Sequence, residues 1–375
     1  MQPSTETRAP VADRRPTGRV AVLYTSAPTV LSDIGRLLDL AGVCEALDPA
    51  ATTALKINIS WQRYYPACST SPWQLDGAIR GLRGAGFRDL IGVQNGTVVV
   101  DSHEGERRNK HGGVLSRHGV PSVHVTDPGT ARVRYAPKAD LLALDRIFPD
   151  GIEIPAVLFG KNVVHLPTVK THVFTTITGA MKNGFGGLLD NNRHWAHAQI
   201  HETLVDLLAI QQEIHPGLFA LMDGTIAGDG PGPRAMRPHV KNLLLASSDL
   251  VAIDAVSAQL QGFDPLSLPF IRLAHERGLG VGDPARIEVC GMDIAGVNFG
   301  FSRSEETLAS RGQKLIYWGP LKRFEKALLR SRIAPWSFMA SNTYYNGLWY
   351  PLVGRRRVKF AKQTEWGRLF DRYPG

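Results

Sequence analysis

The densest group of side chains that could carry out chemistry lies between His165 and His201, directly after a predicted strand. Ligands of open α/β sheets bind beyond the carboxyl ends of the strands. Donors for an anionic group come from Lys170, His172, Lys182 and Asn183. Gly184, Gly186 and Gly187 would let the backbone approach a ligand closely. We expect a site for an anionic small molecule here; the alternative is a solvated loop with a glycine turn.

Three histidines in the same stretch raise the question of a metal. His194, His197 and His201 have i, i+3 and i+7 spacing, which would place them within about 60° of one another on one α-helix. Imidazoles on one face can ligate a metal ion, with Asp190 or Glu202 as further ligands. The spacing matches no known metal signature, and Arg193 would oppose a cation. The alternative is one histidine in the site and two at the surface.

A second polar cluster, Asp223 to Pro233, follows the predicted strand 218–222. An acid at a strand end followed by a glycine-rich loop is typical of a ligand-facing loop, although a rigid turn without a ligand explains it equally well. No GK[ST] closes a Walker A loop, and Pro231 and Pro233 prevent the helix that a dinucleotide fingerprint requires. In the enzyme hypothesis the anion is oriented by Lys56, Lys170 and Lys182. His172 transfers a proton near neutral pH, and Asp223 positions His172 or acts as a second acid/base.

Two further elements bring polar residues to the same sheet. Lys56 and Asn58 leave their predicted strand on one face, upstream of a helix that Ser71 should cap and Pro72 should begin. A lysine near a helix N-terminus suits an anion, although an edge lysine of the sheet is the alternative. Asp254 lies among apolar residues of a predicted helix and needs a partner, either a lysine of the site or a structural donor.

The elements that must position these residues alternate between strands and helices. Apolar patterns predict strands at residues 19–24, 54–60, 89–93, 161–166, 218–222, 241–246 and 286–290, and helices at 30–47, 72–84, 198–213, 250–260 and 266–277. Residues 101–118 are polar and basic and are predicted to be a loop. This rhythm predicts the α/β class, with mostly parallel sheets and flanking helices, in one large domain or two lobes over residues 18–310.

The charge of the chain is concentrated at its end. The 375 residues carry a net charge of +9, which alone would suggest a nucleic-acid or acidic-surface partner. Residues 311–375 carry a net charge of +11 and 13 of the 30 aromatic residues, so the first 310 residues carry −2 and are close to neutral. Leu321 to Ile333 reads as a basic amphipathic helix, suited to an anionic membrane or an acidic protein. The alternative is that the aromatics pack on the body. No nucleic-acid motif is present, so nucleic acid is not the expected partner.

The composition of the chain limits the cellular location and the cofactors that we expect. Cys44, Cys68 and Cys290 are far apart and form no CxxC pair, so no intrinsic iron–sulfur cluster is expected. A reduced, cytoplasmic location fits, with peripheral attachment to a membrane as an option through residues 311–375. No apolar run of membrane-spanning length occurs. Residues 1–17 are rich in Pro, Thr and Arg and are predicted to be disordered.

Five segments together resemble the domain of unknown function 362 family: LKIN, TSP, HLPTVKTHVFTTITGAMKNGFGGLL, DGTIAGDGPGP and ASSDLVAIDAVSAQLQGFDP, which lie between Leu55 and Gly291. The resemblance implies an α/β domain often associated with redox chemistry. Many members add a ferredoxin-like cluster domain, from which this chain departs. Matching motif to motif points to Lys56, Asn58, Lys170, His172, Lys182, Asn183, Asp223, Gly230, Pro231, Asp249 and Asp254.

Two functional hypotheses follow. The first is an enzyme acting on an anionic carboxylate or phosphate. Were its reaction a redox step, electrons would come from an outside protein such as a ferredoxin, whose acidic surface would meet the basic extension. The second is a non-catalytic binding or assembly protein that docks through residues 311–375 to a membrane or a protein partner.

Overall fold

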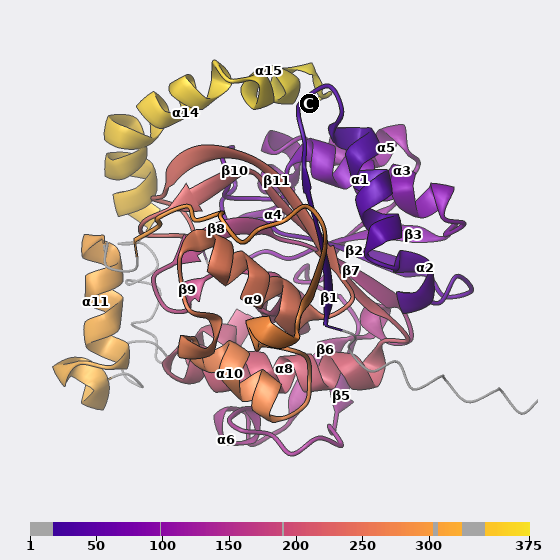
Figure 1. Cartoon of the computed structure of the whole chain (residues 1–375). Coiled ribbons are helices and arrows are strands. Elements are labelled where there is room, and N and C mark those ends of the chain that lie inside the picture. The colour runs from indigo at the N-terminus through magenta and orange to yellow at the C-terminus, as the bar shows by residue number, and fades with distance from the viewer. Residues whose placement is uncertain (1–17, 98, 190, 303–306, 325–341) are drawn as a thin grey trace, which may run out of the picture.

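The computed structural model describes residues 18–97, 99–189, 191–302, 307–324 and 342–375 (Figure 1). The predictions for residues 1–17, and for the part of the amphipathic segment beyond Phe324, lie outside this range. The strands are β1 Arg19–Tyr24, β2 Thr53–Ile57, β3 Leu90–Gln94, β4 Ser122–His124, β5 Arg132–Tyr135, β6 Ile152–Pro155, β7 Asn162–Leu166, β8 Thr168–His172, β9 Thr176–Ile177, β10 Leu218–Asp229, β11 Arg237–Ser247 and β12 Glu288–Gly291.

One large, mostly parallel sheet organises the chain. Its order is β12-β1-β11-β10-β7-β2-β3-β4, with β8 also pairing with β10 and with the short β9. Neighbours are parallel except where β11 pairs with β1 and β10, and where β9 pairs with β8. β5 and β6 form a separate antiparallel pair. The predicted α/β class, with a mostly parallel sheet and flanking helices, is confirmed.

Helices cover both faces of the sheet. They are α1 Val30–Leu40, α2 Val43–Ala46, α3 Pro72–Gly84, α4 Ser102–Arg108, α5 His111–Arg117, α6 Leu144–Ile147, α7 Ala180–Leu188, α8 Ile200–Ile214, α9 Leu250–Gln261, α10 Pro269–Glu276, α11 Leu308–Tyr317, α14 Arg355–Lys362 and α15 Glu365–Arg372. Short 3₁₀ turns are η1 Ala156–Leu158, η2 Asn191–Gln199, η3 Pro265–Ser267, η4 Pro284–Arg286 and η5 Pro320–Phe324, and η6 Thr343–Gly354 is a π-helix. Within the described part of the chain, no helix has the length and apolar character needed to cross a bilayer.

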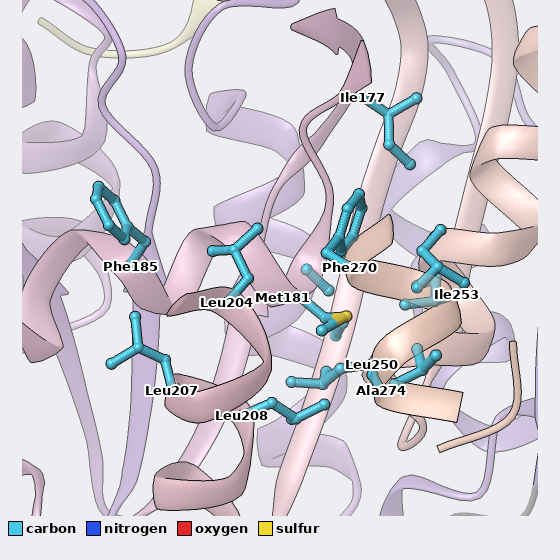
Figure 2. Packing of buried hydrophobic residues seen from close by; sticks show 14 of the residues in the cluster. Ile177, Met181, Phe185, Leu204, Leu207, Leu208, Leu250, Ile253, Phe270 and Ala274 are labelled. Carbon is cyan, nitrogen blue, oxygen red and sulfur yellow. The ribbon is translucent and has the colours of Figure 1, made fainter. Parts of the chain in front are cut away.

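Alternation along the strands divides the core in two. In β1, Val20 and Val22 join one apolar cluster, whereas Ala21 and Leu23 join the other. The first cluster packs α7, α8, α9 and α10 against the sheet, and Figure 2 shows Met181, Leu204, Ile253 and Phe270 of these helices side by side. The second cluster packs α1, α3, α5 and α15 on the opposite face. α7, which carries two predicted site residues, is thereby held by buried side chains.

Local signals account for several boundaries. Ser71 caps α3 through its hydroxyl, which accepts from Gln74 N at 3.2 Å, and Pro72 begins the helix as predicted. Asp249 caps α9 by accepting from Val251 N and Ala252 N, both at 2.9 Å. The helix predicted over 30–47 is two helices, because Gly42 adopts a φ of 71° between them.

Three predictions of local structure are wrong. Residues 101–118 contain α4 and α5 rather than a loop, since Asp101 caps α4 by accepting from Glu104 N at 3.1 Å. Most of the expected glycine-rich loop is strand: β10 continues to Asp229, paired with β11 across a bulge after Gly224. The histidines do not share one α-helix, because His194 and His197 lie in 3₁₀ segment η2 and His201 lies in α8.

A cationic cavity as the candidate functional site

A cavity of about 260 Å³ opens where several strands end. Asn58 follows β2, Asn95 follows β3, and His172 ends β8, and all three line it. The cations on its wall are Lys182, Arg193 and Arg234. Among the described residues that line it, none is Asp or Glu. We call this space the cationic cavity; its composition favours a negatively charged occupant.

Lys182 is the least constrained cation of the cavity. No described residue accepts a hydrogen bond from its ammonium nitrogen, which lies 5.5 Å from the centre of the Phe185 ring. Burial, with the positive charges of Lys170 and Arg193, lowers the pKa of Lys182 to about 7. The lysine is therefore close to half protonated at neutral pH, and an anion beside it would favour the charged form.

α7 carries Lys182 into the cavity, and Asp254 holds the start of α7. The Asp254 carboxylate accepts from Ala180 N at 2.6 Å and Met181 N at 3.0 Å, the amides that a helix N-terminus leaves unpaired. Gly179 makes room for it: a Cβ there would lie 2.4 Å from Asp254 Oδ1. Asp254 was predicted to bind substrate, but the structure places it outside the cavity lining, as the structural acid that remained the alternative.

Lys56 lies behind the wall rather than on it. Its ammonium donates to Asn95 Oδ1 at 2.9 Å and to Ile57 O at 3.0 Å. Burial and the charge of Arg193 lower the pKa of Lys56 to about 7. Lys56 thus orients the Asn95 amide that lines the cavity, and its charge acts on an occupant through that amide.

The three glycines of the motif make room for side chains instead of a ligand. A Cβ at Gly187, where φ is 119°, would lie 2.8 Å from Lys56 Cε. A Cβ at Gly186 would lie 2.8 Å from Asn95 Oδ1, and one at Gly184 would lie 2.5 Å from Gln211 Nε2. The glycines do allow another group to approach the backbone closely, as expected. At Gly184 and Gly187, however, that group is a side chain of the protein and not a ligand.

His172 and Asn183 reach the cavity as predicted. His172 Nδ1 accepts from Phe174 N at 3.1 Å, so the neutral ring carries its proton on Nε2. Burial and the nearby Lys182 and His197 hold the pKa of His172 well below its ordinary range. A neutral imidazole with Nε2–H donates a hydrogen bond but does not readily accept a proton. Asn183 Nδ2 donates to Lys56 O at 2.9 Å, which joins α7 to β2.

Three other predicted residues lie outside the cavity lining. Lys170 is fully buried and donates to Cys68 O at 2.6 Å and Thr168 Oγ1 at 2.9 Å; burial lowers its pKa to about 8. Asp223 accepts from the Ser71 hydroxyl and from Thr225 N, and burial raises its pKa. The carbonyl of Gly230 accepts from Thr171 Oγ1 at 2.6 Å. These groups brace β8, β10 and α3 against one another.

Sequence reasoning missed two arginines and an asparagine of the cavity. Arg193 donates to Gly96 O at 2.7 Å. Arg234 donates to Ser60 O at 3.2 Å and lies 5.3 Å from the centre of the Tyr345 ring. Asn95 could have been found, because it follows β3 as Asn58 follows β2. Arg193 lies in the His165–His201 stretch but is considered there only as an obstacle to a metal ion. Arg234 comes from a segment that only the folded chain brings to these strand ends.

Among the described residues, His194, His197 and His201 do not form a grouped set of metal ligands. The His197 ring stacks on Tyr317 at 5.7 Å and the His201 ring on Phe270 at 6.0 Å. Within the described ranges, the group whose ligand atoms lie within 4.8 Å of one another is His103, His124 and Asp127. Its imidazoles already contact carboxylates: His103 contacts Asp127, and His124 contacts Glu106. Metal binding by His194, His197 and His201 stays a prediction.

The C-terminal segment completes the cavity wall. Tyr317 and Tyr345 line the cavity together with the strand ends. Trp61 Nε1 donates to Asn346 Oδ1 at 2.9 Å, and Trp366 Nε1 donates to Asn242 Oδ1 at 2.7 Å. Trp366 is 2% exposed and packs on Trp73 at 5.2 Å. Several described aromatics of residues 311–375 therefore pack on the body, as one of the two alternatives from the sequence expects, whereas Phe360 stays exposed.

Comparison with known proteins places these features in a family. The chain is 25% identical over 262 residues to a thylakoid-associated protein of Synechocystis sp., a match that covers 68% of this chain and 76% of the relative. No solved structure matches the chain significantly. A family described as a domain of unknown function, DUF362, matches residues 53–259. That range covers more than half of the chain and runs from β2 into α9, so the chain belongs to the DUF362 family.

Proposed function

We propose that the chain binds an anionic small molecule, a carboxylate or a phosphate, in the cationic cavity and acts on it by proton transfer. The observation that carries the proposal is the charge of the described lining, which contains Lys182, Arg193 and Arg234 and no carboxylate. Removing a cation from water is costly, and an anionic ligand beside the Lys182 ammonium, from which no described residue accepts a hydrogen bond, would offset part of that cost.

The proton-transfer role falls to Lys182 in this proposal. Without a bound anion the pKa of Lys182 is about 7, and an anion beside it favours the charged ammonium, so Lys182 would act as the proton donor, a general acid, toward the ligand. His172, predicted as the proton-transfer residue, serves instead as a neutral donor that stabilises negative charge on the ligand. Lys170 and Asp223 support the walls through their buried hydrogen bonds.

Identification of a co-purifying ligand tests the proposal. Native mass spectrometry of the full chain is expected to show a bound carboxylate or phosphate, released on denaturation. Titration calorimetry with sulfate, phosphate and succinate should then show binding that Lys182→Met weakens and that Lys138→Met, at an exposed lysine of the body, leaves unchanged. Absence of any anionic ligand, together with no binding of the three probes, would overturn the proposal.

We also propose that the protein associates peripherally with a membrane. The Synechocystis relative is named for association with thylakoids, and the C-terminal segment here combines exposed cations with exposed apolar side chains. Docking on an acidic redox protein such as a ferredoxin is the competing proposal for the same charges. Co-sedimentation of the full chain with vesicles separates the two, because only the first predicts binding to lipid alone.

A further inference from the structure

An exposed stripe runs along the end of η6 and the length of α14. It consists of Leu348, Leu352, Arg355, Arg356, Lys359 and Phe360. Members of the stripe on successive turns lie three or four residues apart in the chain, so they fall on one side of the helices. The opposite side faces the body: Trp349 lies 6.1 Å from Trp61, and Arg357 donates to Met236 O at 2.9 Å. Figure 1 shows α14, in yellow, at the periphery of the molecule.

The apolar members of the exposed stripe are unusually open to solvent. Leu348 is 52% exposed, Leu352 is 60% exposed and Phe360 is 68% exposed. Three side chains of this kind along one helical face incur a cost in water that a hydrophobic contact would relieve. The packing of the opposite side fixes the helices, so the stripe is presented to solvent by an ordered support.

The basic members lie between the apolar ones. Arg355, Arg356 and Lys359 are exposed, and among the described residues no carboxylate forms an ion pair with any of them. The nearest described pair on α14 joins Lys362 to Asp371, beyond the stripe. The stripe itself contains no acid. Its electrostatic complement is therefore a surface of negative charge.

We infer that the exposed stripe lies on an anionic lipid bilayer, with Leu348, Leu352 and Phe360 at the boundary of the acyl chains and the three cations among the headgroups. This inference rests on the proposed peripheral association and names its surface. Interfacial helices combine bulky apolar and basic side chains in this way. The stripe is about 20 Å long and about 10 Å wide, far less area than the roughly 800 Å² that each partner of a stable protein complex buries. A bilayer needs no such area, because it adapts its surface to one helix.

The experiment measures sedimentation of the full chain with unilamellar vesicles of phosphatidylcholine, with and without about one-third phosphatidylglycerol. We expect binding to the anionic vesicles and its loss at about 1 M salt, where charges are screened within about 3 Å. Replacement of Arg355, Arg356 and Lys359 by Gln is expected to lower the partition coefficient on the order of 100-fold, because each cation contributes about fivefold at an anionic surface.

Matched variants separate charge from position. Arg36, Arg88 and Lys138 are exposed on the body, and their replacement by Gln removes the same charge but should leave binding close to that of the unchanged protein. Leu348→Ser with Leu352→Ser should weaken binding while thermal unfolding stays unchanged, whereas Val240→Ser, at a position 46% exposed, should have no effect on binding. If the unchanged protein fails to bind anionic vesicles, both the association and the stripe are refuted. If it binds but the stripe variants bind equally well, only the stripe is refuted.

Discussion

Affinity of the cationic cavity for anions should fall steeply as pH rises through neutrality. Lys182 has a pKa of about 7 in the unoccupied cavity, against 10.5 for an ordinary lysine. A bound anion favours the charged amine and returns its pKa toward the ordinary value. Binding above pH 7 must then take up a proton, and the affinity falls about tenfold for each further pH unit. Below pH 7 the lysine is already charged, so the affinity levels off.

Sulfate is the suitable probe, because it does not titrate in this range. From about pH 6 to about pH 9 the contribution of Lys182 should lower the sulfate association constant roughly 100-fold. Calorimetry in buffers of different ionisation enthalpy should report uptake of about 0.9 proton at about pH 8. Lys56, with a pKa also of about 7, adds a smaller effect from behind Asn95.

Two variants make the test specific to Lys182. Lys182→Arg keeps its charge at every pH in the range. Sulfate binding to this variant should therefore take up about one proton fewer than binding to the unchanged protein. Lys182→Met removes the charge and should bind sulfate weakly, with a similarly reduced pH dependence. Equal sulfate affinity at both ends of the pH range, or an unchanged proton uptake in Lys182→Arg, would refute the reasoning.

Substitutions at four positions test the supports of the cavity and of the fold around it. Asp254→Ala should lower the free energy of unfolding in urea by about 1–3 kcal/mol and weaken sulfate binding by displacing α7, and Asp254→Asn, which keeps one acceptor, should recover part of both. Gly187→Ala should cost at least about 1–3 kcal/mol and lower sulfate affinity, since its Cβ would meet Lys56 at 2.8 Å; a variant with unchanged melting temperature would contradict this. Ser71→Ala should lower the free energy of unfolding in urea by about 1 kcal/mol and leave the sulfate affinity unchanged. A loss of sulfate affinity would indicate that Asp223, which accepts from the Ser71 hydroxyl, contributes to anion binding. Trp366→Ala should lower the free energy of unfolding by about 3–5 kcal/mol, because the buried ring packs on Trp73. An unchanged urea midpoint would show that α15 does not contribute to the stability of the fold.

Periodicity predicted the strands and helices well where apolar side chains alternate or recur. The Ser71-Pro72 start of α3 was confirmed because its signal is local and chemical. The second half of β10 was missed, since DGTIAGD has the composition of a loop and becomes a strand only by pairing with β11. α4 was missed for a related reason: it is a polar helix whose main signal was the cap at Asp101.

The candidate site was partly predictable for the same physical reason. Asn58, His172, Lys182 and Asn183 line the cavity because strand ends and the helix that follows them converge there. Lys170 lies two positions from His172 in β8, on the same side of the strand, but its amine is buried and donates to Cys68 O and Thr168 Oγ1 instead of reaching the cavity. Arg234 and Tyr345 meet only through long-range contacts, which no local pattern encodes.

The tyrosines of the C-terminal segment on the cavity wall have a thermodynamic consequence. Because Tyr317 and Tyr345 line the cavity, any effect of an occupant on the attachment of the segment equals the effect of the attachment on binding of that occupant. A ligand that binds only when this wall is in place, at about one hundred times its dissociation constant, adds about 2.7 kcal/mol to the attachment. For such a ligand, a proteolytic cut that removes the segment would release it, and ligand content would report whether the segment is attached.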